Sequence, residues 1–308
     1  MQKVRRLQIR TKRQVSDNLS GAYLSVFKGS GVEFDEVRPY VPGDDIRSID
    51  WNVTARTGVP HIKRFVEERE LCIMLLVDIS SSQDFGLEGR SKRDTASEIA
   101  ALLAFSAISN SDKVGLILFH SEAEKFIPPR KGQKHALRVV REILVDQDGK
   151  SRTKDPWYRR WIRFTRKNKQ KMGRGTDISS ALEFCHQTLS RKAIIFVVSD
   201  FLDQNYLATM QRVHRKHDVV GISISDKAEH SLPKLGLINL VDLETGREVV
   251  VDSSALEEDF VKKQTTRKQK LEAQFQNSGI DLISLDQKTD ALTELMRFLR
   301  KRERRGAK

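Results

Sequence analysis

Cysteine is scarce in this sequence, with two residues, Cys72 and Cys185, among 308. Neither belongs to a C-x-x-C pair, so the sequence offers no zinc cluster and no disulfide framework. Each lies in an apolar segment, where a free cysteine packs as a small hydrophobic residue. We therefore expect both to be reduced side chains of the core.

Long hydrophobic runs are also missing. The longest, at 71–77 and 193–198, are far too short to cross a bilayer, which takes about 20 apolar residues in a helix. No apolar segment follows the basic N-terminus, so no secretory signal is expected. These absences predict a soluble protein of the cytoplasm.

The motifs of several enzyme classes are absent as well. The sequence has no Walker A loop, no G-x-G-x-x-G turn and no G-x-S-x-G nucleophile elbow. Its seven histidines are scattered, and neither His61 nor His186 has a second ligand four residues on or a neighbouring catalytic acid. We expect no ATP hydrolysis and, more broadly, no enzymatic activity.

Positive charge is abundant, with a formal net charge of +13 that is concentrated in three blocks, at 1–14, 150–174 and 297–308. The middle block holds eleven Lys and Arg against one acid, with Trp157, Tyr158, Trp161 and Phe164 interleaved. Basic charge with aromatic side chains is typical of nucleic-acid binding. It equally suits an anionic membrane surface, an acidic protein or a solvated insert, and the sequence leaves these readings open.

From residue 71 the hydrophobic pattern alternates between strands and helices. Apolar runs predict strands at 71–79, 113–119, 192–201, 218–226 and 280–285, with an edge strand at 124–129 and a hairpin at 236–252. Helical spacing predicts helices at 92–110, 135–145, 175–189, 204–217, 254–278 and 287–304. Such alternation indicates a doubly wound α/β fold with a mostly parallel sheet.

The same pattern predicts the domain organisation. Residues 71–226 form the main domain, with a basic insert at 148–174, and residues 227–308 complete it with a hairpin, a strand and helices. Residues 1–70 read as a turn-rich, β-leaning extension that packs on this core through Trp51 and Phe65.

Three acids of this extension, Asp44, Asp45 and Asp50, suggest either a metal or acid–base cluster or a structural turn. We favour the turn, with Arg38 and Arg47 as ion-pair partners.

Oxygen-bearing side chains follow the predicted strands where those strands end. Asp78, Ser80 and Ser82 form a D-x-S-x-S loop after the first strand, Thr176 opens a helix, and Asp200 follows the strand at 192. Sites in such sheets lie beyond the carboxyl ends of the strands, so these side chains are expected to converge. Hard oxygen donors suit Mg²⁺ above all, and also Mn²⁺ or Ca²⁺. The sequence therefore predicts a divalent-metal site.

Other interpretations of these loops stay open. Asp and Ser at strand ends also satisfy turns and helix N-termini. We read Asp177 as an N-terminal helix charge rather than a ligand. Ser199 is either a hydroxyl supporting the site or an ordinary exposed serine.

The N-terminal extension carries a recognisable signature. The segments GVEF (31–34), VRPYVPGDDIRSIDW (37–51), PHIKRF (60–65) and EERE (67–70) resemble domain of unknown function 58, a MoxR-associated family with a von Willebrand A-like core. The resemblance spans about 20–226. It implies that the metal-binding loops form an adhesion-type site, and that the protein acts as an adaptor for a MoxR-type AAA+ ATPase, or binds its client, in chaperone-like assembly.

Two other functions compete with this non-enzymatic interaction module. One is a nucleic-acid or anionic-surface binder acting through 150–174. The other is a Mg²⁺-dependent phosphoryl-transfer enzyme, because some phosphatases also begin with an Asp at a strand end. Those enzymes need a second acid two residues on, where this chain has Ser80.

Overall fold

The computed structural model divides the chain into two compact units, Phe27–Leu71 and the remainder, Met1–Val26 with Cys72–Lys308. The residues that the structure describes are 31–68, 70–84, 91–145, 176–226, 236–241, 248–286 and 289–306, with Tyr23, Val26 and Glu229. The predicted insert at 148–174 lies outside the described residues. The expected packing of the N-terminal extension on the core concerns the placement of the two units, and it stays a prediction.

The smaller unit is built on an antiparallel hairpin of β1 (Gly31–Pro39) and β2 (His61–Glu68). A 3-10 turn, η2 (Ile46–Ser48), and a short helix, α3 (Trp51–Thr57), lie between the two strands. The β-leaning character expected of this segment is therefore present. Trp51, its expected anchor residue, is 68% exposed.

The three acids of this unit are structural. Asp50 accepts hydrogen bonds from the backbone N–H groups of Asn52 (2.9 Å) and Val53 (3.3 Å), which caps the N-terminus of α3. Asp44 forms the expected ion pair with Arg38, at 2.7 Å. The expectation for Arg47 is corrected, because its backbone N–H bonds the Asp45 carboxylate.

The cation that pairs with Asp50 is Lys63, whose Nζ lies 3.2 Å from Asp50 Oδ2. Asp50 precedes α3 in the sequence and Lys63 follows it in β2, and the fold of this unit brings the two side chains together.

The larger unit contains a six-stranded sheet in the order β10-β7-β6-β3-β4-β5. Its strands are β3 (Cys72–Asp78), β4 (Lys113–Phe119), β5 (Ala123–Arg130), β6 (Ile194–Ser199), β7 (Asp218–Ser225) and β10 (Asp281–Asp286). All pairings are parallel except that of β4 with β5. The antiparallel outer strand β5 contains Pro128 and Pro129 and corresponds to the edge strand predicted at 124–129.

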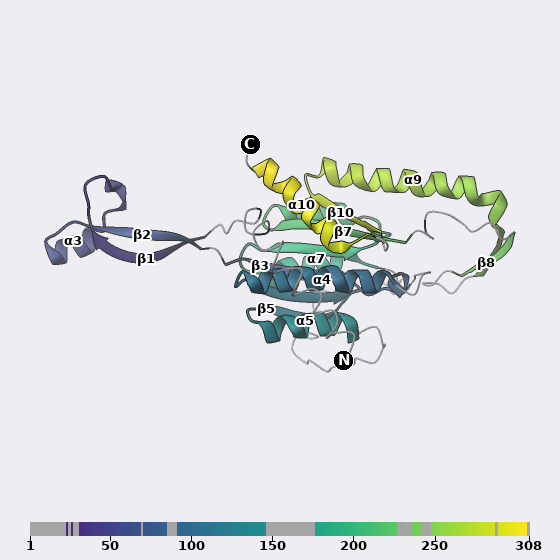
Figure 1. The fold of residues 1–308 in the computed structure, drawn as a ribbon, viewed down its shortest axis with the longest axis horizontal. Coiled ribbons are helices and arrows are strands. Elements are labelled where there is room, and N and C mark those ends of the chain that lie inside the picture. The colour runs from purple at the N-terminus through teal and green to yellow at the C-terminus, as the bar shows by residue number, and fades with distance from the viewer. Residues whose placement is uncertain are drawn as a thin grey trace. The chain divides into compact units, whose positions relative to one another are not determined.

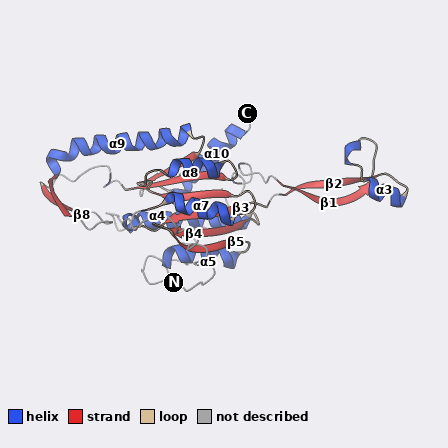
Figure 2. Ribbon diagram, turned by 180° about the vertical axis from the view of Figure 1, so that it is seen from behind, coloured by secondary structure: helices blue, strands red, loops and turns tan. Residues whose placement is uncertain are grey.

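Helices cover both faces of the sheet (Figures 1 and 2). One face carries α4 (Lys92–Ser109), α5 (Gln133–Val145) and α10 (Ala291–Gly306), and α4 contacts the other two. The opposite face carries α7 (Ile178–Thr188) and α8 (Tyr206–His214), joined by the C-terminal part of α9 (Ser253–Asn277). This confirms the predicted doubly wound α/β fold.

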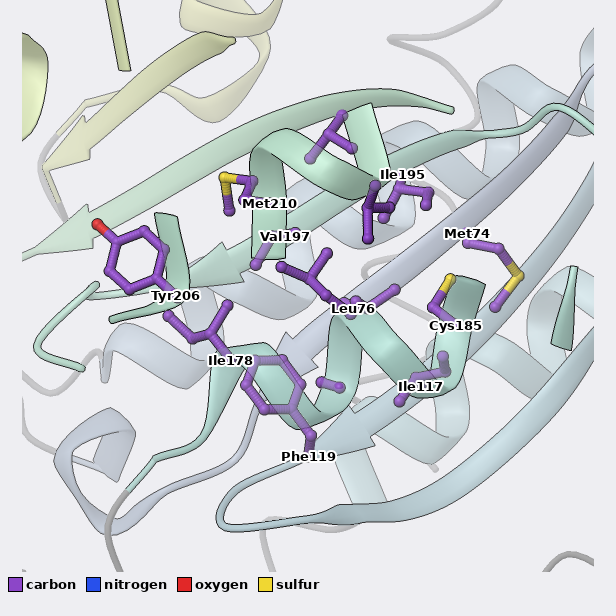
Figure 3. Packing of buried hydrophobic residues seen from close by; sticks show 14 of the residues in the cluster. Met74, Leu76, Ile117, Phe119, Ile178, Cys185, Ile195, Val197, Tyr206 and Met210 are labelled. Atoms are coloured by element: carbon purple, nitrogen blue, oxygen red, sulfur yellow. The ribbon is translucent and has the colours of Figure 1, made fainter. Parts of the chain in front are cut away.

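The core beneath α7 and α8 is continuous. Leu76, Ile117 and Val197 of the three central strands meet Ile178 and Cys185 of α7 (Figure 3). Both cysteines carry reduced thiols, with Cys185 buried and Cys72 half-buried, as expected. The helix α9 follows a hairpin of β8 (Leu237–Val241) and β9 (Glu248–Asp252), where the sequence predicts one. In the part of the chain that is described, no helix is long and apolar enough to cross a membrane.

His186 of α7 packs edge to face with His217, which directly precedes β7. The rings of His186 and His217 are 5.3 Å apart at 90°, and His217 is 1% exposed. Within the described residues, neither ring nitrogen of His217 has a hydrogen-bond partner. Burial, with the nearby charges of Lys216 and His186, lowers the pKa of His217 to about 4.

We predict that replacing His217 removes part of the acid sensitivity of the fold. The unfolded chain protonates His217 near pH 6.5 and the folded chain near pH 4, so stability is lost as the pH falls between these values. The variant His217→Leu should gain on the order of 2 kcal/mol over the wild type at pH 4.5, and little at pH 7. Urea titrations at both pH values measure this difference. Parallel pH profiles for the two proteins would refute it.

A second prediction concerns Gly221 in β7. A methyl group at this position would overlap the ring of Phe275, which α9 packs against the sheet. The variant Gly221→Ala should therefore lower the free energy of unfolding by about 1–3 kcal/mol, the usual cost of overpacking. The matched control is Ser223→Ala in the same strand, which should change stability by less than about 0.5 kcal/mol. Equal effects of the two substitutions in urea denaturation would contradict the prediction.

Candidate metal centre

The three central strands end at one edge of the sheet. β3 pairs in parallel with β4 on one side and β6 on the other, with Asp78 opposite Phe119 and Val77 opposite Val198. The backbone N–H of Ile79 donates to the Phe119 carbonyl at 2.8 Å, which extends the pairing past the end of β3. The loops that follow β3, β4 and β6 therefore begin side by side. We call this part of the molecule the carboxyl edge.

Asp78 is the last residue of β3 and is 1% exposed. Its Oδ1 accepts a hydrogen bond from the Ser80 backbone N–H at 2.9 Å, and its Oδ2 accepts one from Ser199 Oγ at 2.6 Å. Burial and the charge of Asp200 raise the pKa of Asp78 to about 6, although these hydrogen bonds oppose the rise. A carboxylate in this position is stabilised by any cation that reaches it.

The two serines of the D-x-S-x-S loop lie together, as the sequence predicts. Ser80 is buried and Ser82 half-buried, and their hydroxyl oxygens are 3.0 Å apart. The loop continues into a 3-10 turn, η3 (Ser81–Asp84). Both hydroxyls thus belong to the same short segment as Asp78.

Thr176 lies at the same edge, on a different loop. The next residue, Asp177, donates its backbone N–H to the carbonyl of His120 at 2.7 Å, and His120 directly follows β4. Asp177 Oδ1 accepts a hydrogen bond from the backbone N–H of Ser180 at 2.8 Å, which caps α7. The expectation that Asp177 serves the helix N-terminus is confirmed.

Asp200 directly follows β6 and is 6% exposed. Its Oδ1 accepts a hydrogen bond from the Leu202 backbone N–H at 3.3 Å. The next residue, Phe201, has a φ of +52°, an uncommon conformation for a bulky side chain. Its ring packs against Tyr206 and Phe275, with centroids 5.4 and 5.2 Å away, and this packing holds the turn that presents Asp200.

Three further residues lie at the carboxyl edge. The sequence left the role of Ser199 undecided and did not single out Lys92 or Glu229. Ser199 is fully buried and donates a hydrogen bond to Asp78, so the reading as an exposed serine is wrong. Lys92 donates to Asp200 Oδ2 at 2.9 Å and to Glu229 Oε1 at 2.5 Å. No local sequence pattern indicates a role for Glu229, and Lys92 stands in a sequence typical of an exposed helix start.

The donor set fits a small divalent cation. It combines two carboxylates with the hydroxyls of Ser80, Ser82 and Thr176, all of them hard oxygen donors. Gln83, which is fully buried in η3, has no partner for either polar atom of its amide within the described residues. No group of three or more His, Cys, Asp or Glu suited to a metal occurs among the described residues. Any ion held here would therefore rely on hydroxyls and keep open positions.

The chain matches the family model described as "Protein of unknown function DUF58" over residues 36–270. It is 30% identical over 307 residues to the uncharacterized protein Rv1480 of Mycobacterium tuberculosis, covering 99% of this chain and 90% of that protein. The uncharacterized protein Mb1516 of Mycobacterium bovis matches to the same extent. A shorter match, 28% identical over 109 residues, is to the uncharacterized protein YeaD of Bacillus subtilis, covering 35% of this chain and 25% of that protein.

Two solved structures match the chain at lower identity. The conserved hypothetical protein BatB from Bacteroides thetaiotaomicron is 14% identical, with a TM-score of 0.44, covering 76% of this chain and 99% of that chain. The VWA domain of SpRpn10 is 11% identical, with a TM-score of 0.33, covering 73% of this chain and 93% of that chain.

The family model matches most of the length of this chain, which therefore belongs to the DUF58 family.

Proposed function

We propose that the protein is a non-enzymatic interaction module whose carboxyl edge holds a divalent ion, most favourably Mg²⁺, for binding an acidic residue of a partner protein. The observation that carries the proposal is the buried carboxylate of Asp78, held between the Ser80 backbone and Ser199 with Asp200 nearby. A buried acid with a second acid beside it is costly unless a cation compensates the charge.

Each residue of the carboxyl edge has a distinct part in this proposal. Ser80, Ser82 and Thr176 would supply neutral hydroxyl oxygens, while Asp78 and Asp200 would supply charge. Ser199 would orient Asp78 through the 2.6 Å hydrogen bond. When bound, the ion supplies an electrophilic position that a carboxylate from outside the chain completes. Because Mn²⁺ and Ca²⁺ accept the same oxygen donors, they are the alternative ions.

The partner is proposed from the family. The DUF58 resemblance suggests a MoxR-type AAA+ ATPase or its client, with a role in chaperone-like assembly or maturation, in the cytoplasm or peripherally at the inner membrane surface. The residues of the carboxyl edge support only the general part of this proposal, which is recognition of an acidic group through a metal.

The competing functions have less support. The nucleic-acid or anionic-surface reading rests on 150–174, outside the described residues. The phosphoryl-transfer reading needs a second acid two residues after Asp78. Ser80 occupies that position, and its side chain contacts Ser82.

We predict that Asp78→Asn removes metal-dependent partner binding and leaves the fold intact. Asparagine keeps an oxygen for the Ser80 N–H and can hydrogen-bond Ser199, but it lacks the charge that binds Mg²⁺. Thermal unfolding should show that Mg²⁺ stabilises the wild type and not the variant, because a ligand bound only by the folded state stabilises it by mass action. Without metal, the variant should be as stable as the wild type or slightly more stable.

The matched control is Asp112→Asn. Asp112 is also 1% exposed, and it precedes β4, at the opposite edge of the sheet, where it accepts a hydrogen bond from Tyr23. This variant should retain the full Mg²⁺ response. A pull-down from lysate with and without EDTA gives the second measurement. Equal Mg²⁺ shifts for wild type and Asp78→Asn, or equal capture of partner, would count against the proposed function.

A further inference from the structure

A lysine is buried beside the candidate metal centre. Lys92 is the first residue of α4 and is 0% exposed. Its ammonium lies 2.9 Å from Asp200 Oδ2 and 2.5 Å from Glu229 Oε1. A lysine is almost never fully buried unless its charge is paired, and here two carboxylates pair it.

The position of Lys92 in its helix is unfavourable for a cation. The N-terminal turn of a helix carries partial positive charge, which favours acids and disfavours Lys and Arg. Arg93, the next residue, is also nearly buried, at 5% exposed. Two buried cations at the positive end of α4 are therefore stabilised by neighbouring groups and not by the helix itself.

Asp200 and Glu229 provide that stabilisation for Lys92. The Lys92 ammonium donates a hydrogen bond to each of these carboxylates, so its positive charge is paired on two sides. It also occupies one of the two carboxylate oxygens of Asp200, while the other accepts the Leu202 N–H.

We propose that Lys92 is a built-in competitor of the divalent ion: it shares Asp200 with the metal and lowers the affinity of the carboxyl edge for it. This inference rests on the proposed function, because the ion in question is the one assigned there. Any ion approaching Asp200 meets a positive charge already bound to that carboxylate. Without metal, the same lysine compensates part of the negative charge of Asp200, which it shares with Glu229.

A purely structural ion pair behaves differently from such a competitor. It would contribute equally to the metal-free and metal-bound protein, so its removal would lower stability without changing metal affinity. A competitor, when removed, lowers the stability of the metal-free protein and raises metal affinity. The stability of the metal-free protein and the metal affinity, measured together, therefore distinguish a structural ion pair from a competitor.

The test is the variant Lys92→Met, which keeps the length of the side chain and removes its charge. Mn²⁺ binding to the full chain is measured by isothermal titration calorimetry, together with melting temperatures in EDTA and in Mn²⁺. We expect the affinity for Mn²⁺ to rise on the order of tenfold, since a unit charge near the ion is lost. The melting temperature in EDTA should fall, because Asp200 and Glu229 lose their partner.

The matched control is Lys125→Met. Lys125 of β5 pairs with Glu142 of α5, so the substitution also removes one lysine from an ion pair with an acid. It changes the net charge equally but leaves Asp200 and Glu229 untouched, and Mn²⁺ affinity should stay within about twofold of the wild type. Should Lys92→Met fail to fold, the double variant Lys92→Met/Glu229→Gln removes one of the two unpaired acids and still exposes Asp200 to the ion.

The outcomes separate the two proposals. If the wild type and Lys92→Met bind Mn²⁺ with the same affinity, the proposed role of Lys92 is wrong and the metal site is supported. Binding by Lys92→Met alone supports the competition and overturns a metal-dependent function for the natural protein. Absence of binding in both overturns both proposals.

Discussion

The parallel register of three strands governs everything at the carboxyl edge. Because β3 lies between β4 and β6 and runs in the same direction as both, the residues that follow each strand emerge at one level. The hydrogen bond from Ser199 Oγ to Asp78 Oδ2 is a direct result, joining residues 121 positions apart in the chain. A shift of one residue in the pairing of β3 with β6 would turn the side chains of one strand to the opposite face and separate this pair.

The sequence was sufficient for the parts of the site that follow from local rules. An apolar run that ends in Asp or Ser-Asp predicts a buried strand with a polar end, and Asp78 and Asp200 were found in this way. The capping role of Asp177 likewise depends only on the helix that follows it. The core strands and helices were predictable for the same reason, since their hydrophobic periodicity is set by neighbouring residues.

Side-chain partners that are distant in the sequence could not be predicted from local patterns. Lys92 bonds Asp200 and Glu229 across 108 and 137 residues, and nothing near Lys92 in the sequence indicates that it is buried. The sequence predicts Arg47 as an ion-pair partner of these acids, whereas the hairpin brings Lys63 to Asp50. In both cases the partner is determined by how strands and helices come together, which residue spacing does not encode.

The outermost strand β5 has a consequence for the behaviour of the protein in concentrated solution. The unpaired backbone of an edge strand can serve as a template for a strand from another molecule, which starts aggregation. Pro128 and Pro129 stand in β5 without backbone N–H groups, and charged side chains of Glu124, Lys125 and Arg130 lie along the same strand. Together they make this margin of the sheet a poor surface for adding a strand from another molecule.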